Sequence, residues 1–245
     1  MTPFPQPWAT TDIARNIGVF VRGDKKNRGH GPNERNASFD YCFNHFQSFR
    51  ESGNVPALAE GPHLVESCLH LGFFLASWGM FRASGTLLRK SARCLQGVIG
   101  CAAHTPLDIW EIDAHDYTDE AIGALGRLYD SIAAALREPS GLGREPSQIL
   151  VTKIMLGVFG NVPAFDNYFM QGSGLRGFGR DALAALGRYY RANQGTFDTE
   201  RSKLRTFDFI TGKPTARPYT RAKLLDMVFW VEGQKHSQQN GVNLR

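Results

Sequence analysis

The chain of 245 residues has few cysteines and no long apolar run, and each shortage excludes a class of protein. Its four cysteines sit in or beside apolar stretches and form no CxxC pair; they are Cys42, Cys68, Cys94 and Cys101. This usage is typical of buried free thiols in a reduced compartment, so we expect neither disulfides nor a zinc or iron–sulfur site. The longest strongly apolar run, LHLGFFLASWGM (69–80), is too short to span a bilayer.

The N-terminal segment MTPFPQPWATTD lacks the basic stretch followed by an apolar one that marks a secretory signal. We therefore expect a cytoplasmic protein. We also expect no membrane partner and no cofactor. Hydrophobic residues make up 42% of the chain, which is ordinary for a globular protein. The length allows one large domain or two lobes that share a cleft.

Acidic residues are scarce in the last part of the chain. Residues 176–245 hold 13 Lys/Arg against 6 Asp/Glu, whereas residues 1–175 hold 15 against 17. A basic excess confined to one region indicates a surface that faces a polyanion. A merely solvated basic face is the alternative.

Alternating strand patterns are also scarce, and helical periodicity dominates. The sequence predicts an all-α fold, a two-lobed helical bundle. Residues Asn36, Ser84 and Thr118 are the expected caps of helix starts. Helices are predicted from residue 37 through SFDYCFNHFQSF and over residues 61–80, 84–102, 117–137, 147–159, 180–193 and 218–233.

A glycine turn and one aspartate are the most informative feature. The stretch GLGREPSQILVTKIMLGVFGNVPAFDNYF (141–169) places Asp166 23 residues after Gly143, beyond a predicted helix and a short turn. Glycines let a backbone turn tightly and approach a phosphate closely. As an N-cap of the next short helix, Asp166 would contribute about 1 kcal/mol. As a functional group, it would need to lie in a cleft near the turn.

The order of glycine turn, helix and aspartate resembles that of the helix-hairpin-helix DNA glycosylases, the superfamily of endonuclease III and 8-oxoguanine DNA glycosylase. The matching motifs are GLG (141–143) and VPAFDNYF (162–169). The resemblance implies a helix-hairpin-helix motif followed by a catalytic Asp166, which stabilises the cationic sugar or activates water as the glycosidic bond breaks. It also implies that double-stranded DNA is the partner of a monomer. Gly141, Gly143, Arg144 and Lys153 are the expected contacts to the DNA backbone.

Bifunctional members of this family carry a lysine shortly after the second hairpin glycine, where it forms a Schiff base with the sugar. Arg144, Glu145 and Pro146 occupy that stretch here, so the resemblance implies a monofunctional enzyme. Lys153, ten residues after Gly143, is in the middle of a helix and has a phosphate or a buried carboxylate as its expected partner. Ser140 replaces the usual apolar residue before the hairpin, and the last third of the chain lacks the cysteines of an iron–sulfur loop.

Two further segments are candidates for base flipping. LASWGMFRASGTLL (75–88) resembles the segment that family members push into the duplex, and Trp78, Phe81 and Arg82 are its wedge or pocket candidates. A core turn between helices is the alternative. In the helix after Asn36, Phe39 is a stacking candidate, although ordinary packing explains it as well. Asp40 and Asn44 are expected on a polar pocket wall.

These patterns predict two lobes, one formed by residues 1–60 with 170–245 and the other by 61–169, with DNA across the cleft. The expected activity is removal of a damaged or modified base, with a bulky modified cytosine of phage DNA as one candidate. A non-catalytic helical DNA-binding protein is one rival. A metal-dependent nuclease is another, because the carboxylate-rich segment DIWEIDAHDYTDE (108–120) contains Asp113, His115 and Asp116.

Overall fold

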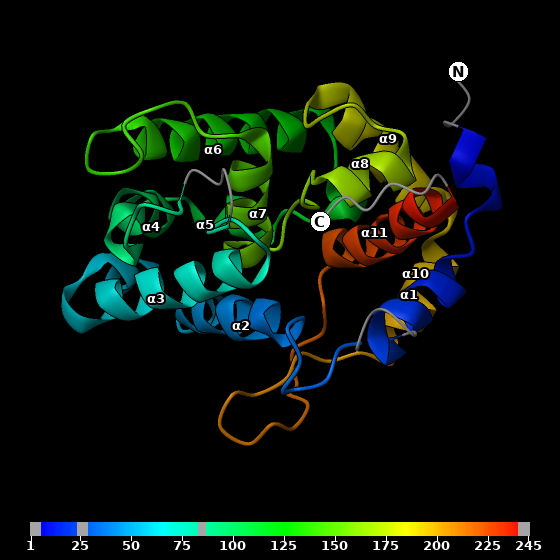
Figure 1. Ribbon diagram of the computed structural model, residues 1–245, viewed down its shortest axis with the longest axis horizontal. Helices are drawn as coiled ribbons and strands as arrows, with labels where there is room; N and C mark the ends of the chain where they lie inside the picture. Colours follow the sequence, from blue (N-terminus) through cyan, green and yellow to red (C-terminus); the bar gives the residue numbers. More distant parts are fainter. Residues whose placement is uncertain (1–5, 24–28, 83–86, 240–245) are drawn as a thin grey trace.

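The computed structural model describes residues 6–23, 29–82 and 87–239, and this part of the chain is helical (Figure 1). It contains no β-strand, and its one β-bridge joins Phe207 to Pro214. The predicted all-α fold is confirmed. The α-helices are α1 (Ile13–Arg22), α2 (Ala37–Glu51), α3 (Gly61–Ser77), α4 (Gln96–Ala103), α5 (Leu107–Glu111), α6 (Asp119–Arg137), α7 (Gln148–Val158), α8 (Asn167–Ser173), α9 (Arg180–Ala192), α10 (Gln194–Ser202) and α11 (Arg221–Gln239); the 3-10 helices are η1 (Gln6–Thr10), η2 (Val55–Ala59), η3 (Ala92–Leu95) and η4 (Ala114–Asp116).

The helices gather into two groups (Figure 1). Helices α2 to α7 lie on one side, where α2 packs against α3 and α7 and α4 packs against α6. On the other side α11 packs against α8 and α1. Helix α2, expected in the lobe of residues 1–60 and 170–245, packs against α3 and α7, and its Asn44 also donates to the Phe207 carbonyl in the C-terminal part. Among the described residues, none of the helices combines the length and apolar composition needed to span a bilayer.

Two glycines set how closely α8 and α11 approach. A Cβ on Gly172 would lie 1.9 Å from the Phe229 carbonyl oxygen, and one on Gly233 would lie 1.9 Å from that of Tyr168. No side chain fits at either position, so the two backbones touch. Because Asp166 begins α8, this contact fixes the aspartate beside α11.

Of the caps predicted at Asn36, Ser84 and Thr118, the one at Thr118 is confirmed. The Thr118 hydroxyl accepts a hydrogen bond from the Ala121 amide at the start of α6. Asn36 precedes α2 as predicted, but its side chain does not cap the helix and instead donates to the Gly29 carbonyl. The helix predicted over residues 84–102 is wrong in its first part, because the chain turns after Leu87 to bury that side chain. Ser84 lies outside the described residues.

Candidate functional site

Asp166 lies at the N-terminus of α8, after a turn that follows α7. Its Oδ1 accepts a hydrogen bond from the Phe169 amide at 3.0 Å, so the predicted capping role is confirmed. Its Oδ2 accepts a second bond, at 2.9 Å, from the Lys153 ammonium on α7. The Lys153 side chain is 4% exposed and that of Asp166 is 16% exposed. The carboxylate therefore faces a cation that is buried almost completely.

The turn that carries Asp166 is held from both sides. The Phe165 amide donates to the Thr152 hydroxyl on α7 at 3.0 Å, and the Ala164 amide donates to Asp226 on α11 at 3.1 Å. The Phe165 ring is fully buried and meets the Phe169 ring of α8 edge-on, with the ring centres 5.0 Å apart. These bonds satisfy the backbone of a buried turn and fix the position of the carboxylate.

Asp166 opens onto a small pocket between α3, α7, α8 and α11. The pocket is narrow: its cavity volume is about 10 Å³, which is room for about one water molecule, and it opens to solvent. Its lining combines aromatic rings with two lysines and two aspartates: Phe74, Trp78, Lys153, Leu156, Ala164, Asp166, Lys223, Asp226 and Trp230. Such a mixture of apolar walls and a few convergent polar groups is typical of a ligand site.

Trp78 occupies the centre of the lining. The Lys153 ammonium lies 5.1 Å from the centre of its ring, and the Trp230 ring meets it edge-on at 6.0 Å. Its indole Nε1 is buried and has no acceptor among the described residues. A buried donor of this kind is normally satisfied by an ordered water or a ligand.

A second ion pair lines the same pocket. Lys223 donates to Asp226 at 2.8 Å, and their side chains are 1% and 7% exposed. The Lys223 ammonium also lies 4.7 Å from the Phe39 ring and 5.4 Å from the Trp78 ring, within the range of cation–π attraction. The sequence-based prediction missed this pair. Its signal was two charges in the otherwise apolar stretch AKLLDMVFWV (222–231).

The predicted site residues fall into two sets. The structure brings Trp78, Lys153 and Asp166 together in the pocket, with Phe39 behind Lys223. Lys153, which was expected to contact the DNA backbone, is thus an internal partner of the aspartate. Arg82 is exposed beside Gly79, next to Trp78, and Phe81 packs against the hydrophobic core. Asp40, Asn44 and the glycine turn do not line the pocket.

Asp40 and Asn44 belong to a buried polar network instead of the pocket wall. Asp40 is fully buried and accepts bonds from Tyr219 at 2.9 Å and from the Phe207 amide at 2.8 Å, with His30 at 2.8 Å. Burial, and then the Asp40 charge, raise the pKa of Tyr219 far above its ordinary value. Asn44 donates to the Phe207 carbonyl at 2.9 Å. Both residues therefore anchor the loop that leads from α10 to α11.

The glycine turn lies between α6 and α7, as its sequence indicates. Gly143 adopts a positive φ of 69°, which favours glycine. The amides of Gly141 and Gly143 both donate to the Glu138 carbonyl, at 2.9 and 3.0 Å. Arg144 is exposed, and its amide has no backbone acceptor within the described chain. Among the amides of residues 141–144, that of Arg144 is thus the one available to an external phosphate.

The carboxylate-rich segment has structural partners. Asp113 accepts hydrogen bonds from the Arg221 and Ala222 amides, each at 2.8 Å, and so caps the start of α11. His115 pairs with Asp116 at 3.0 Å. Within the described ranges, no three His, Cys, Asp or Glu side chains are grouped as metal ligands would be. This geometry lends the nuclease alternative no support.

No protein-family model, curated protein or solved structure matches this chain. The resemblance to the helix-hairpin-helix glycosylases therefore stays a prediction from two short motifs.

Proposed function

We propose that the protein is a monofunctional DNA glycosylase that flips a damaged or modified base out of double-stranded DNA and hydrolyses its N-glycosidic bond. The observation that supports this most is the place of Asp166: a fixed carboxylate at the edge of an aromatic pocket, after a glycine turn and a helix. In this proposal the pocket widens when DNA binds, and the flipped base then lies against Trp78. The anion of Asp166 lies beside the sugar.

The chemistry suits these groups. As the bond between sugar and base breaks, positive charge develops on the sugar, and a fixed anion in a partly desolvated pocket lowers that barrier. Asp166 is preorganised, because the α8 backbone and Lys153 hold its two oxygens. A water then adds to the sugar carbon as the bond to the base breaks, the base leaves with the electron pair of that bond, and the proton lost by the water ends on the departing base. The products are a free base and an abasic site.

A non-catalytic helical DNA-binding protein is the second candidate, and one observation favours it. Asp166 has a complete structural role, since it caps α8 and neutralises a buried lysine. In that case the exposed Arg144 and the basic region after residue 175 bind DNA without chemistry.

Base release separates the two candidates. The protein is incubated with duplexes that each carry one modified base, among them bulky modified cytosines, and alkali then cleaves any abasic site. A glycosylase yields strand breaks at one kind of base. The binding protein yields none with any duplex.

A further inference from the structure

The lining of the pocket holds two cations and two anions, and two further cations lie beside it. Two of the four cations there, Lys153 and Lys223, are paired with the two aspartates. The other two are Arg35 and Arg82, at exposed positions next to Trp78. Within the described chain, neither guanidinium has a carboxylate or a side-chain hydrogen bond as a partner. Two positive charges at this site therefore have no counter-charge, and both belong to guanidinium groups.

The two guanidiniums lie over consecutive residues. The Arg35 Cζ is 5.0 Å from the centre of the Trp78 ring. The Arg82 guanidinium folds over Gly79, where Nη2 lies 3.4 Å from the position that a Cβ would take. Gly79 has a φ of 84° and no side chain to push Arg82 away. Both cations thus lie beside Trp78 or Gly79, outside the buried pairs and outside the lining of the pocket.

The charges of Arg82 and Asp166 both act on Arg35. Burial, and then the nearby charge of Arg82, lower the pKa of Arg35, while the charge of Asp166 opposes this shift. Two neighbouring guanidiniums repel each other unless an anion lies between them. Guanidiniums bind phosphate oxygens through paired N–H groups, which makes arginine suited to this anion.

We propose that Arg35 and Arg82 form a phosphate-binding site beside Trp78, which holds the phosphate of a nucleotide. The phosphate belongs to a DNA strand if the proposed function holds, and on that function this part of the inference rests. A free nucleoside monophosphate presents the same chemistry. The two sources are separated by experiment.

The test measures fluorescence anisotropy of a labelled duplex that contains a tetrahydrofuran abasic-site analogue. It compares the wild type with Arg35→Gln, Arg82→Gln and the double variant. Each single change weakens binding about tenfold, because a charge-assisted hydrogen bond is lost. The double variant loses less affinity than the product of the two single-variant losses, because both arginines hold the same phosphate. Its slope of log K against log salt concentration falls by about one.

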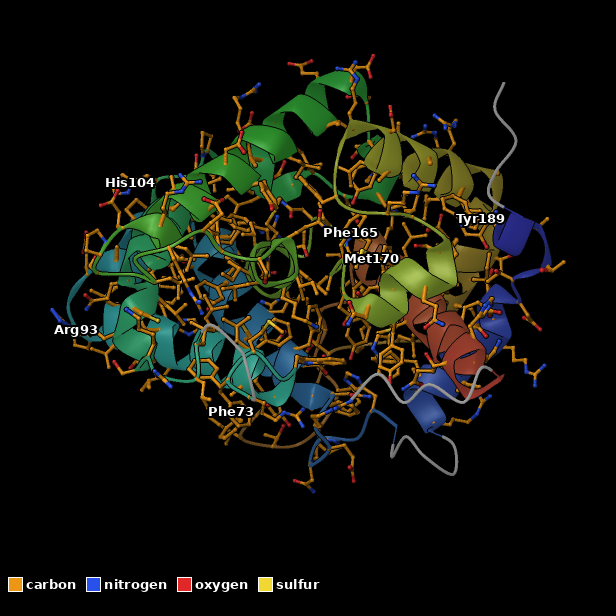
Figure 2. All side chains as sticks on the ribbon, turned by 45° about the horizontal axis from the view of Figure 1, so that its top comes forward. Phe73, Arg93, His104, Phe165, Met170 and Tyr189 are labelled. Carbon is orange, nitrogen blue, oxygen red and sulfur yellow. The ribbon has the colours of Figure 1, made fainter. Side chains whose placement is uncertain are left out.

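Arg93→Gln is the matched control, because Arg93 is exposed at the far edge of the molecule (Figure 2). It should bind like the wild type. A second arm titrates adenosine, cytidine, guanosine and thymidine monophosphates against tryptophan fluorescence. Thermal melts of all variants confirm that each is folded, and the exposed Arg82 gives a test that does not depend on packing over Trp78.

Loss of duplex binding in the arginine variants, with Arg93→Gln unchanged, supports a site for a DNA phosphate. Loss confined to the monophosphate arm supports a site for a free nucleotide. Unchanged affinity in both arms overturns the inference. Base release with normal KM in the double variant would also overturn it while leaving the glycosylase proposal intact. Arginine-dependent binding without base release leaves the site intact and removes the glycosylase.

Discussion

Lys153 and Asp166 lie 13 residues apart in the chain, and their side chains meet with Nζ 2.9 Å from Oδ2. The lysine comes from the middle of α7 and the aspartate caps α8, so the pair joins two helices across the turn between them. A buried lysine needs this carboxylate whatever the function is. Any change at Asp166 therefore alters both the proposed chemistry and the stability of the fold.

Asp166→Asn should lower the free energy of unfolding by about 2–3 kcal/mol, because it leaves the Lys153 ammonium buried without a counter-charge. The amide still caps α8. In Lys153→Met/Asp166→Asn the buried charge is gone, and stability should return to within about 1 kcal/mol of the wild type. Urea denaturation measures both values. Equal stability of the single variant and the wild type would mean that the pair is not buried as described.

Borohydride should trap no covalent adduct between the wild-type protein and a duplex with a modified base. A Schiff base needs an uncharged amine that is free to attack the sugar. Lys153 and Lys223 are instead held in ion pairs with Asp166 and Asp226. Denaturing gels reveal an adduct as a shifted band. An adduct that disappears in Lys153→Ala or Lys223→Ala would identify a lyase and its nucleophile.

Asp226→Asn should destabilise the fold by about 3 kcal/mol, because Lys223 is 1% exposed and would lose its only carboxylate partner in the described chain. The amide oxygen can still accept the Ala164 amide. The matched control is Glu200→Gln, which removes the partner of Lys203 at the same i,i+3 spacing on an exposed surface. It should change stability by less than about 0.5 kcal/mol. Chemical denaturation gives both values, and equal losses would refute the buried character of the Lys223 pair.

His45 makes the fold sensitive to mild acid. Its ring stacks on His70 at 4.3 Å, and burial, and then the His70 charge, lower its pKa to about 4. In the unfolded chain His45 is protonated as the pH falls through about 6.5, whereas in the folded protein it is protonated only near pH 4. The stability that the fold owes to an uncharged His45 is therefore complete above pH 6.5 and is lost as the pH falls toward 4.

The expected result is a Tm that falls between pH 7 and pH 5, and by less in His45→Gln than in the wild type. His104→Gln, at an exposed position, should keep the wild-type dependence. Identical profiles for His45→Gln and the wild type would contradict the account of His45.

Local chemistry made much of the fold predictable. Helical spacing gave the all-α class, and side-chain oxygens at Thr118 and Asp166 marked real helix starts. Helix α1 was not predicted, although Asp12 caps it and Ile13, Ile17 and Phe20 line its buried face. Helix α10 was not predicted either, because its sequence has no apolar face: Phe197 is its only buried residue.

The pocket was predictable only in part, because its members come from distant segments. Asp166 and Trp78 each had a local motif. Lys223 and Asp226 lie about 60 residues later in the chain, and only the contact between α8 and α11 brings them to Asp166. Asp40 looked like a pocket residue because its helix face is polar. The partners that bury it, Tyr219 and the Phe207 amide, come from a loop that no local pattern placed there.

The most direct test of the central claim is base release by Lys153→Met/Asp166→Asn, compared with the wild type and Lys153→Met, on the duplex that the wild type cleaves. The double variant is expected to fold and to bind DNA, since it keeps the cap and leaves no buried charge unpaired. Alkali-sensitive strand breaks should appear with the wild type and fall at least a hundredfold in the double variant, the usual effect of removing one electrostatic group. Breaks at the rate of Lys153→Met would contradict a catalytic role for Asp166.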